Sequence, residues 1–178
     1  MRSVNPTSKI TAFSEKAEKE IREILTRYPD KRSALLPVLN LAQAEFGHIS
    51  EDVMVIVANR LDLTPPKVYE VLTFYTLLNE KPVGKYLIQL CRTLSCALAG
   101  SENILGHFQQ KLGIGIGKTT ADGLFTLRTV ECLASCGTAP AVQINGAFYE
   151  NLTREKVDRI LDDLKRGAEP VPKAMGEN

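Results

Sequence analysis

Four cysteines are the residues of this chain best suited to chemistry, and they fall into two close pairs. Cys91 and Cys96 are separated by four residues, and Cys132 and Cys136 by three. Four thiolates hold a tetrahedral zinc ion, a [2Fe-2S] cluster or a [4Fe-4S] cluster, or they pair as disulfides. The spacing therefore has to be weighed together with the elements that position the thiols.

Each cysteine pair follows a strand-like run. Residues 86–90 are short and apolar and end directly at Cys91, and residues 124–130 alternate as a strand and lead into Cys132. Helical spacing between them, at about 101–112, predicts a right-handed crossover with the two strands parallel. The C-terminal ends of parallel strands meet at one edge of a sheet. We therefore expect both pairs at the same rim, where open α/β sheets usually place their sites.

The widths of the two cysteine loops favour an iron-sulfur cluster and leave other chemistry open. Structural zinc usually binds two C-x2-C knuckles, and bacterial [4Fe-4S] motifs place three cysteines close together. The wider loops here suit two irons, and their small residues allow backbone N–H groups to approach the sulfurs. Zinc, dithiol redox chemistry and unrelated buried thiols remain alternatives at this point.

Helical patterns fill the first eighty residues. Ser14 is a predicted N-cap for a helix ending at Pro29, and a second helix spans about 33–46, with a kink or a late start at Pro37. Ser50 and Thr64 begin two further predicted helices. The C-terminal half has the predicted order β-α-β-β-β-α, with a hairpin at residues 141–149 and a last helix capped by Thr153.

Composition limits the functional classes. Charges nearly cancel, with 22 Lys and Arg against 21 Asp and Glu, so no nucleic-acid partner is expected. No apolar run reaches the ~18 residues of a spanning helix, and the N-terminus lacks a signal-peptide core. We expect a soluble cytoplasmic protein, where cysteines are more often metal ligands or redox groups than structural disulfides.

Three stretches give the sequence a family resemblance: residues 68–76 (VYEVLTFYT), the C-x4-C, and residues 129–153 (TVECLASCGTAPAVQINGAFYENLT). Together they make residues 15–165 similar to the thioredoxin-like [2Fe-2S] E-type (24 kDa-type) subunit of NADH:quinone oxidoreductase (respiratory complex I). The resemblance implies an α+β fold in which an N-terminal helical bundle precedes a thioredoxin-like [2Fe-2S] ferredoxin domain. The expected boundaries are 1–80 (1–11 flexible), 81–166, and a flexible tail at 167–178.

The resemblance also implies a role. One [2Fe-2S] cluster would be bound by Cys91, Cys96, Cys132 and Cys136, the first pair on one iron and the second pair on the other. It would exchange single electrons with the FMN of a neighbouring NADH-binding flavoprotein subunit, so FMN and NADH would bind there and not to this chain. The large iron-sulfur subunit of the peripheral arm would be a second partner. We expect a subunit of this translocase that does not turn over NADH when isolated.

The resemblance places the chain at the cytoplasmic face of a bacterial inner membrane, without membrane insertion. An equivalent diaphorase subunit of an NAD-reducing hydrogenase or an NAD-dependent formate dehydrogenase is the alternative assembly, and a structural zinc module is the alternative from another class. The chain has Ala134 where many relatives carry Gly. Because Ala tolerates a positive φ less well, this residue could shift a hydrogen bond to sulfur.

Other motifs carry weaker signals. The glycine-rich run before Lys118 and Thr119 lacks the first glycine of a phosphate loop, because Leu112 stands there. His48 and His107 have no ligand-spaced neighbour and are interpreted as surface or helix-face residues. No pair of acidic residues is placed for acid-base catalysis, and no catalytic residue is predicted.

Overall fold

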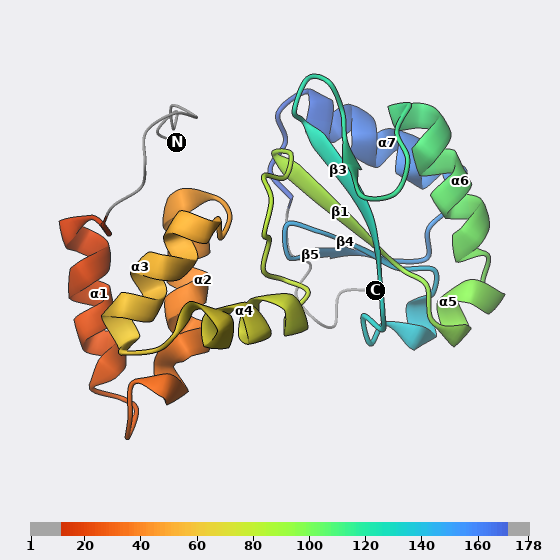
Figure 1. Ribbon diagram of the computed structural model, residues 1–178. Coiled ribbons are helices and arrows are strands. Elements are labelled where there is room, and N and C mark those ends of the chain that lie inside the picture. The colour runs from red at the N-terminus through yellow and green to blue at the C-terminus, as the bar shows by residue number, and fades with distance from the viewer. Residues whose placement is uncertain (1–11, 171–178) are drawn as a thin grey trace. The chain divides into compact units, whose positions relative to one another are not determined.

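The computed structural model describes residues 12–170. The chain divides into two compact units, residues 1–82 and residues 83–178 (Figure 1). The expectation of flexible ends falls largely on residues 1–11 and 171–178, which lie outside the described residues. Residues 167–170 are described, and the carbonyl of Ala168 accepts a hydrogen bond from the Tyr86 hydroxyl at 3.1 Å.

The first unit is helical. Its elements are α1 (Glu15–Leu25), the 3-10 turn η1 (Arg32–Ala34), α2 (Leu35–Phe46), α3 (Glu51–Leu61) and α4 (Pro65–Phe74). Each helix contributes apolar side chains to one core, in which Ile21, Leu39, Val57 and Val68 are fully buried. An amphipathic helix is stabilised chiefly by this kind of burial, so the four helices depend on one another.

Local sequence signals set the helix boundaries. The side chains of Ser14 and Ser50 accept hydrogen bonds from the first turns of α1 and α3, as predicted. Pro37 is the third residue of α2, where its missing N–H costs nothing, so the predicted late start is confirmed. The prediction that the first helix reaches Pro29 is wrong, because α1 ends at Leu25 and turns follow.

The second unit is built on one five-stranded sheet. Its strands are β1 (Tyr86–Cys91), β2 (Lys118–Thr119), β3 (Phe125–Val130), β4 (Val142–Ile144) and β5 (Ala147–Tyr149), in the order β2-β3-β1-β4-β5. Strand β1 is central and buried along its whole length. It pairs parallel with β3, as predicted, and antiparallel with β4. Strands β4 and β5 form the predicted hairpin, with its turn at Asn145 and Gly146.

Three helices accompany this sheet: α5 (Leu94–Leu98), α6 (Ser101–Leu112) and α7 (Arg154–Lys165). Phe108 of α6 and Leu161 of α7 share one core with Ile88 and Leu127 of the sheet. Helix α6 is the crossover between β1 and β3, so it fixes the parallel arrangement on which the site depends. Strand β2 and helix α5 were not predicted. Helices together with one sheet confirm the predicted α+β class.

Candidate functional site

The cysteines lie at the end of the sheet where β1 and β3 finish together. In the parallel register Cys91 is opposite Val130, so Cys132 follows two residues beyond the partner of Cys91. The backbone N–H of Cys91 donates to the carbonyl of Ala141 at 3.1 Å. Three segments from distant parts of the sequence therefore meet around Cys91; the crossover argument predicted the meeting of the two cysteine segments, and the structure adds the segment at Ala141.

The first pair is buried. Cys91 and Cys96 are each about 3% exposed and form a small apolar cluster with Ala141, against which Leu133 packs. Cys96 is in α5, the short helix that begins just after Thr93. This helix brings Cys96 back against Cys91, and each thiol affects the pKa of the other.

The surroundings of the buried pair affect its two thiols differently. Burial by itself raises the pKa of Cys91, but hydrogen bonds from Thr93 and from the backbone N–H of Leu133 outweigh it and leave the pKa below its ordinary value. The Cys91 Sγ lies 3.2 Å from the Thr93 Oγ1. Burial, together with the nearby Cys91 and Cys136, raises the pKa of Cys96 above its ordinary value, although a backbone hydrogen bond at Ala141 opposes this.

The second pair is exposed, and its loop has an unusual backbone. Ala134 has a φ of 60°, and its N–H donates to the Cys132 Sγ at 3.3 Å. Cys136 begins a 3-10 turn (Cys136–Thr138), and the Thr138 hydroxyl donates to a carboxylate oxygen of Glu150 at 2.6 Å. A residue in the left-handed conformation and a backbone donor to sulfur therefore occur together in this loop.

The two pairs lie against each other. Leu133, between Cys132 and Ala134, reaches the buried pair with both its side chain and its N–H, and Cys136 lies close enough to act electrostatically on Cys96. Figure 1 shows the segment after β3 beside α5 at one end of the sheet. Among residues 12–170, no three Cys, His, Asp or Glu side chains are grouped as ligands of a single metal ion.

A family model described as "Thioredoxin-like [2Fe-2S] ferredoxin" matches residues 21–165. The chain belongs to this family. The match includes all four cysteines and most of the helical unit. The family resemblance predicted from the sequence is therefore confirmed.

Two curated relatives place this family member more closely. The chain is 45% identical over 152 residues to the NADH-quinone oxidoreductase E-type subunit numbered 2 of Rhizobium meliloti (strain 1021), in a match that covers 85% of this chain and 90% of that protein. It is also 45% identical over 163 residues to the NADH-quinone oxidoreductase E-type subunit of Rickettsia conorii (strain ATCC VR-613 / Malish 7), covering 89% and 98%. These relatives are oxidoreductase subunits.

One solved structure supports the fold. A chain of an NAD+-reducing [NiFe]-hydrogenase in the air-oxidized state superimposes with a TM-score of 0.67 at 21% identity, over 76% of this chain and 23% of that chain. At this identity the similarity is evidence for the fold alone.

The donor set fits the cluster that the family name states. All four donors are thiols, and four backbone N–H groups, those of Thr93, Leu133, Ala134 and Ala141, are placed to donate to them. Such donors stabilise negative charge on sulfur. The small loop residues made backbone donors predictable in general, but not the roles of Thr93 and Leu133, which depend on folding.

The weaker motifs take structural positions. Lys118 and Thr119 of the glycine-rich run form β2, which pairs with β3. His107 on α6 lies 2.8 Å from a carboxylate oxygen of Asp158 on α7, and so joins the two helices. Burial lowers the pKa of His48.

Proposed function

We propose that this chain is the electron-transfer subunit of an NADH-quinone oxidoreductase and holds one [2Fe-2S] cluster on Cys91, Cys96, Cys132 and Cys136. The observation that carries the proposal is the meeting of two cysteine pairs at the ends of neighbouring parallel strands, in a member of a [2Fe-2S] family. The names of the curated relatives support the choice of complex.

The two pairs have different tasks in this proposal. Cys91 and Cys96 bind one iron inside the protein, where burial excludes water, and Cys132 and Cys136 bind the other iron at the surface. When bound, the cluster accepts and releases one electron at a time. The N–H groups of Leu133 and Ala134 stabilise the negative charge on the sulfurs, and so help to set the reduction potential.

The exposed pair suggests the side from which electrons arrive. Cys132 and Cys136 form the accessible part of the site, so we place the FMN of an NADH-binding flavoprotein subunit on this side. NADH then binds to that partner and not to this chain. We further propose that the helical bundle of the first unit docks on partner subunits, including the large iron-sulfur subunit, at the cytoplasmic face of the membrane. No helix among residues 12–170 is long and apolar enough to cross a membrane.

A second assembly has a specific observation in its favour. The fold is shared with a chain of an NAD+-reducing hydrogenase, so the same module also suits a diaphorase of that kind or of an NAD-dependent formate dehydrogenase. Adjacent genes distinguish these assemblies. Genes for membrane-arm subunits support the NADH-quinone oxidoreductase, and genes for hydrogenase or formate dehydrogenase catalytic subunits without them contradict it.

Ligand substitution tests the site. Cys96→Ala and Cys132→Ala should each abolish the brown absorbance of the anaerobically purified protein, because each removes a ligand of a different iron. Ser95→Ala and Ser135→Ala are matched controls in the same two loops and should keep the absorbance. Full absorbance in both cysteine variants would exclude these ligands.

Electron exchange tests the role. NADH should bleach the visible absorbance of the cluster only when the FMN-containing flavoprotein subunit is present in catalytic amounts. NADH oxidation by this chain alone, free of flavin, would contradict the assignment of NADH binding to the partner. No bleaching with the active flavoprotein would contradict the proposed partner.

A further inference from the structure

The two cysteine-bearing segments carry only one positive and one negative side chain. In residues 91–100 the single charged residue is Arg92, and in residues 131–140 it is Glu131. Arg92 directly follows Cys91, and Glu131 directly precedes Cys132. Each charge is therefore adjacent in sequence to one of the proposed ligands, and the two charges belong to different cysteine segments.

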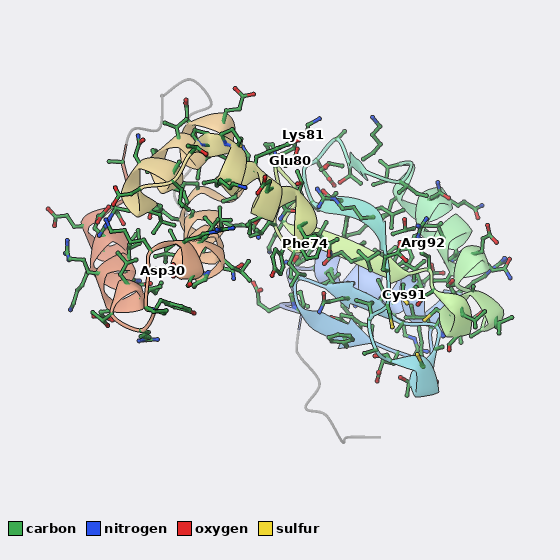
Figure 2. The ribbon with its side chains drawn as sticks, turned by 60° about the horizontal axis from the view of Figure 1, so that its bottom comes forward. Asp30, Phe74, Glu80, Lys81, Cys91 and Arg92 are labelled. Carbon is green, nitrogen blue, oxygen red and sulfur yellow. The ribbon has the colours of Figure 1, made fainter. Side chains whose placement is uncertain are left out.

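These two residues are paired with each other. The Arg92 guanidinium donates to the Glu131 Oε1 through Nε at 3.1 Å and through Nη2 at 2.8 Å. The backbone N–H of Arg92 also donates to the carbonyl of Val130 at 3.1 Å, one residue beyond the β1–β3 ladder. Figure 2 shows Arg92 next to Cys91 at this end of the sheet. The ion pair thus joins the residues that directly follow the last β1–β3 pair, Cys91 and Val130.

We propose that Arg92 and Glu131 are positioning residues that hold the two cysteine pairs in register and balance the charge beside them. The inference rests on the proposed cluster function. Cys91 is the last residue of β1, whereas Cys132 lies two residues beyond the end of β3, so the sheet does not hold Cys132 directly. The Arg92–Glu131 pair links the first residues after each strand, so it restrains both cysteine loops at once.

The paired charges also have an electrostatic consequence. Reduction adds an electron to the site, so a positive neighbour favours the reduced form and a negative neighbour disfavours it. With both present, the two effects largely cancel. Loss of one charge leaves the effect of the other uncompensated. Loss of the positive charge should therefore lower the reduction potential, and loss of the negative charge should raise it.

If Arg92 and Glu131 were only an ordinary surface ion pair, a different result would be expected. Both side chains are mostly exposed, at 64% and 70%, and such pairs often contribute nothing measurable to stability. A merely solvated pair leaves both the reduction potential and the retention of the cluster unchanged. Measurements of the reduction potential and of cluster retention therefore distinguish a positioning role from that of an ordinary surface ion pair.

The test compares the wild-type full chain, purified with its cluster, with two single variants and their double variant. Arg92→Gln should lower the midpoint potential in a titration monitored by electron paramagnetic resonance, and Glu131→Gln should raise it. The double variant should return close to the wild-type value. Each single shift should correspond to about a three- to tenfold change in the ratio of reduced to oxidised protein at fixed potential, where tenfold is about 59 mV.

Cluster retention supplies the second readout. Both single variants and the double variant should lose visible absorbance to an iron chelator about threefold faster than the wild type, the size of effect that an exposed ion pair supports. The charge-reversed double variant Arg92→Glu/Glu131→Arg should retain the cluster as the wild type does, because the pair is re-formed.

Arg166→Gln is the matched control. Arg166 pairs with Asp163 at the end of α7 and is two residues from Ala168. The carbonyl of Ala168 accepts a hydrogen bond from Tyr86, the first residue of β1, whereas Cys91 is the last residue of that strand. This variant loses one exposed arginine away from the cysteines and should change neither readout. If Arg92→Gln and Glu131→Gln behave like Arg166→Gln, the inference is overturned while the cluster assignment stands. A wild-type protein without an iron-sulfur cluster overturns both.

Discussion

Replacing Ala134 by glycine tests the backbone geometry of the exposed cysteine loop. Ala134 has a φ of 60° and an exposed side chain, so the change removes a strained Cβ and no packing. The other non-glycine residues with positive φ among residues 12–170 are Asp62, Asn145 and Asn151, types that tolerate this conformation through local hydrogen bonds. Alanine has no such compensation.

The expected gain follows from two opposing effects. The left-handed conformation costs an L-residue roughly 1–2 kcal/mol, and glycine avoids this cost. Glycine in turn loses about 0.5–1 kcal/mol through the greater freedom of the unfolded chain. Ala134→Gly should therefore stabilise the second unit by about 0.5–1 kcal/mol and raise its unfolding temperature by roughly 3–6 °C.

Thermal unfolding of the metal-free, reduced full chain, followed by circular dichroism, measures this change. Ala99→Gly is the matched control, because Ala99 is an exposed alanine at the C-cap of α5, three residues after Cys96, with a φ of −79°. It should lower the unfolding temperature, since glycine brings only the entropic cost there. If both variants lower the temperature equally, Ala134 does not occupy the left-handed conformation.

Three further predictions concern stability. Gly84→Ala should destabilise the second unit by about 1–3 kcal/mol in urea unfolding, because its Cβ would lie 2.9 Å from backbone atoms of Leu124; an unchanged midpoint would contradict this close approach. Ser50→Ala should lower the stability of the first unit by about 1 kcal/mol in the same assay through loss of the α3 cap, and a neutral result would contradict the cap. The neighbouring Lys111 lowers the pKa of Asp158, so this carboxylate stabilises the fold above its unfolded pKa of about 3.9 and loses that contribution as the pH falls through the lower folded value. Asp158→Asn should therefore flatten the pH dependence of the unfolding midpoint below about pH 4, and an unchanged profile would contradict this linkage.

The long elements of the fold were predictable because their signals are local. Serine caps, apolar periodicity and the Asn145–Gly146 turn specify helices and a hairpin without tertiary information. Helix α5 was missed because a five-residue helix has too few turns to show periodicity. Strand β2 was missed because its two exposed residues are defined only by pairing with β3.

The site was predictable in its position but not in its details. The crossover rule placed Cys91 and Cys132 at one rim from sequence order alone. It could not show that one pair is buried and the other exposed, because the buried pair packs with Ala141 and Leu133, which only the folded chain brings together. The Arg92–Glu131 pair was also missed, since its members are 39 residues apart and meet only through the β1–β3 register.

Metal and sulfide analysis, combined with electron paramagnetic resonance of the dithionite-reduced protein, tests the central claim most directly. Anaerobically purified chain should contain two irons and two acid-labile sulfides, as the family name states, and give a low-temperature signal after uptake of one electron. Cys96→Ala should lack that signal. One zinc ion per chain, with no iron and no resonance, would contradict the electron-transfer role.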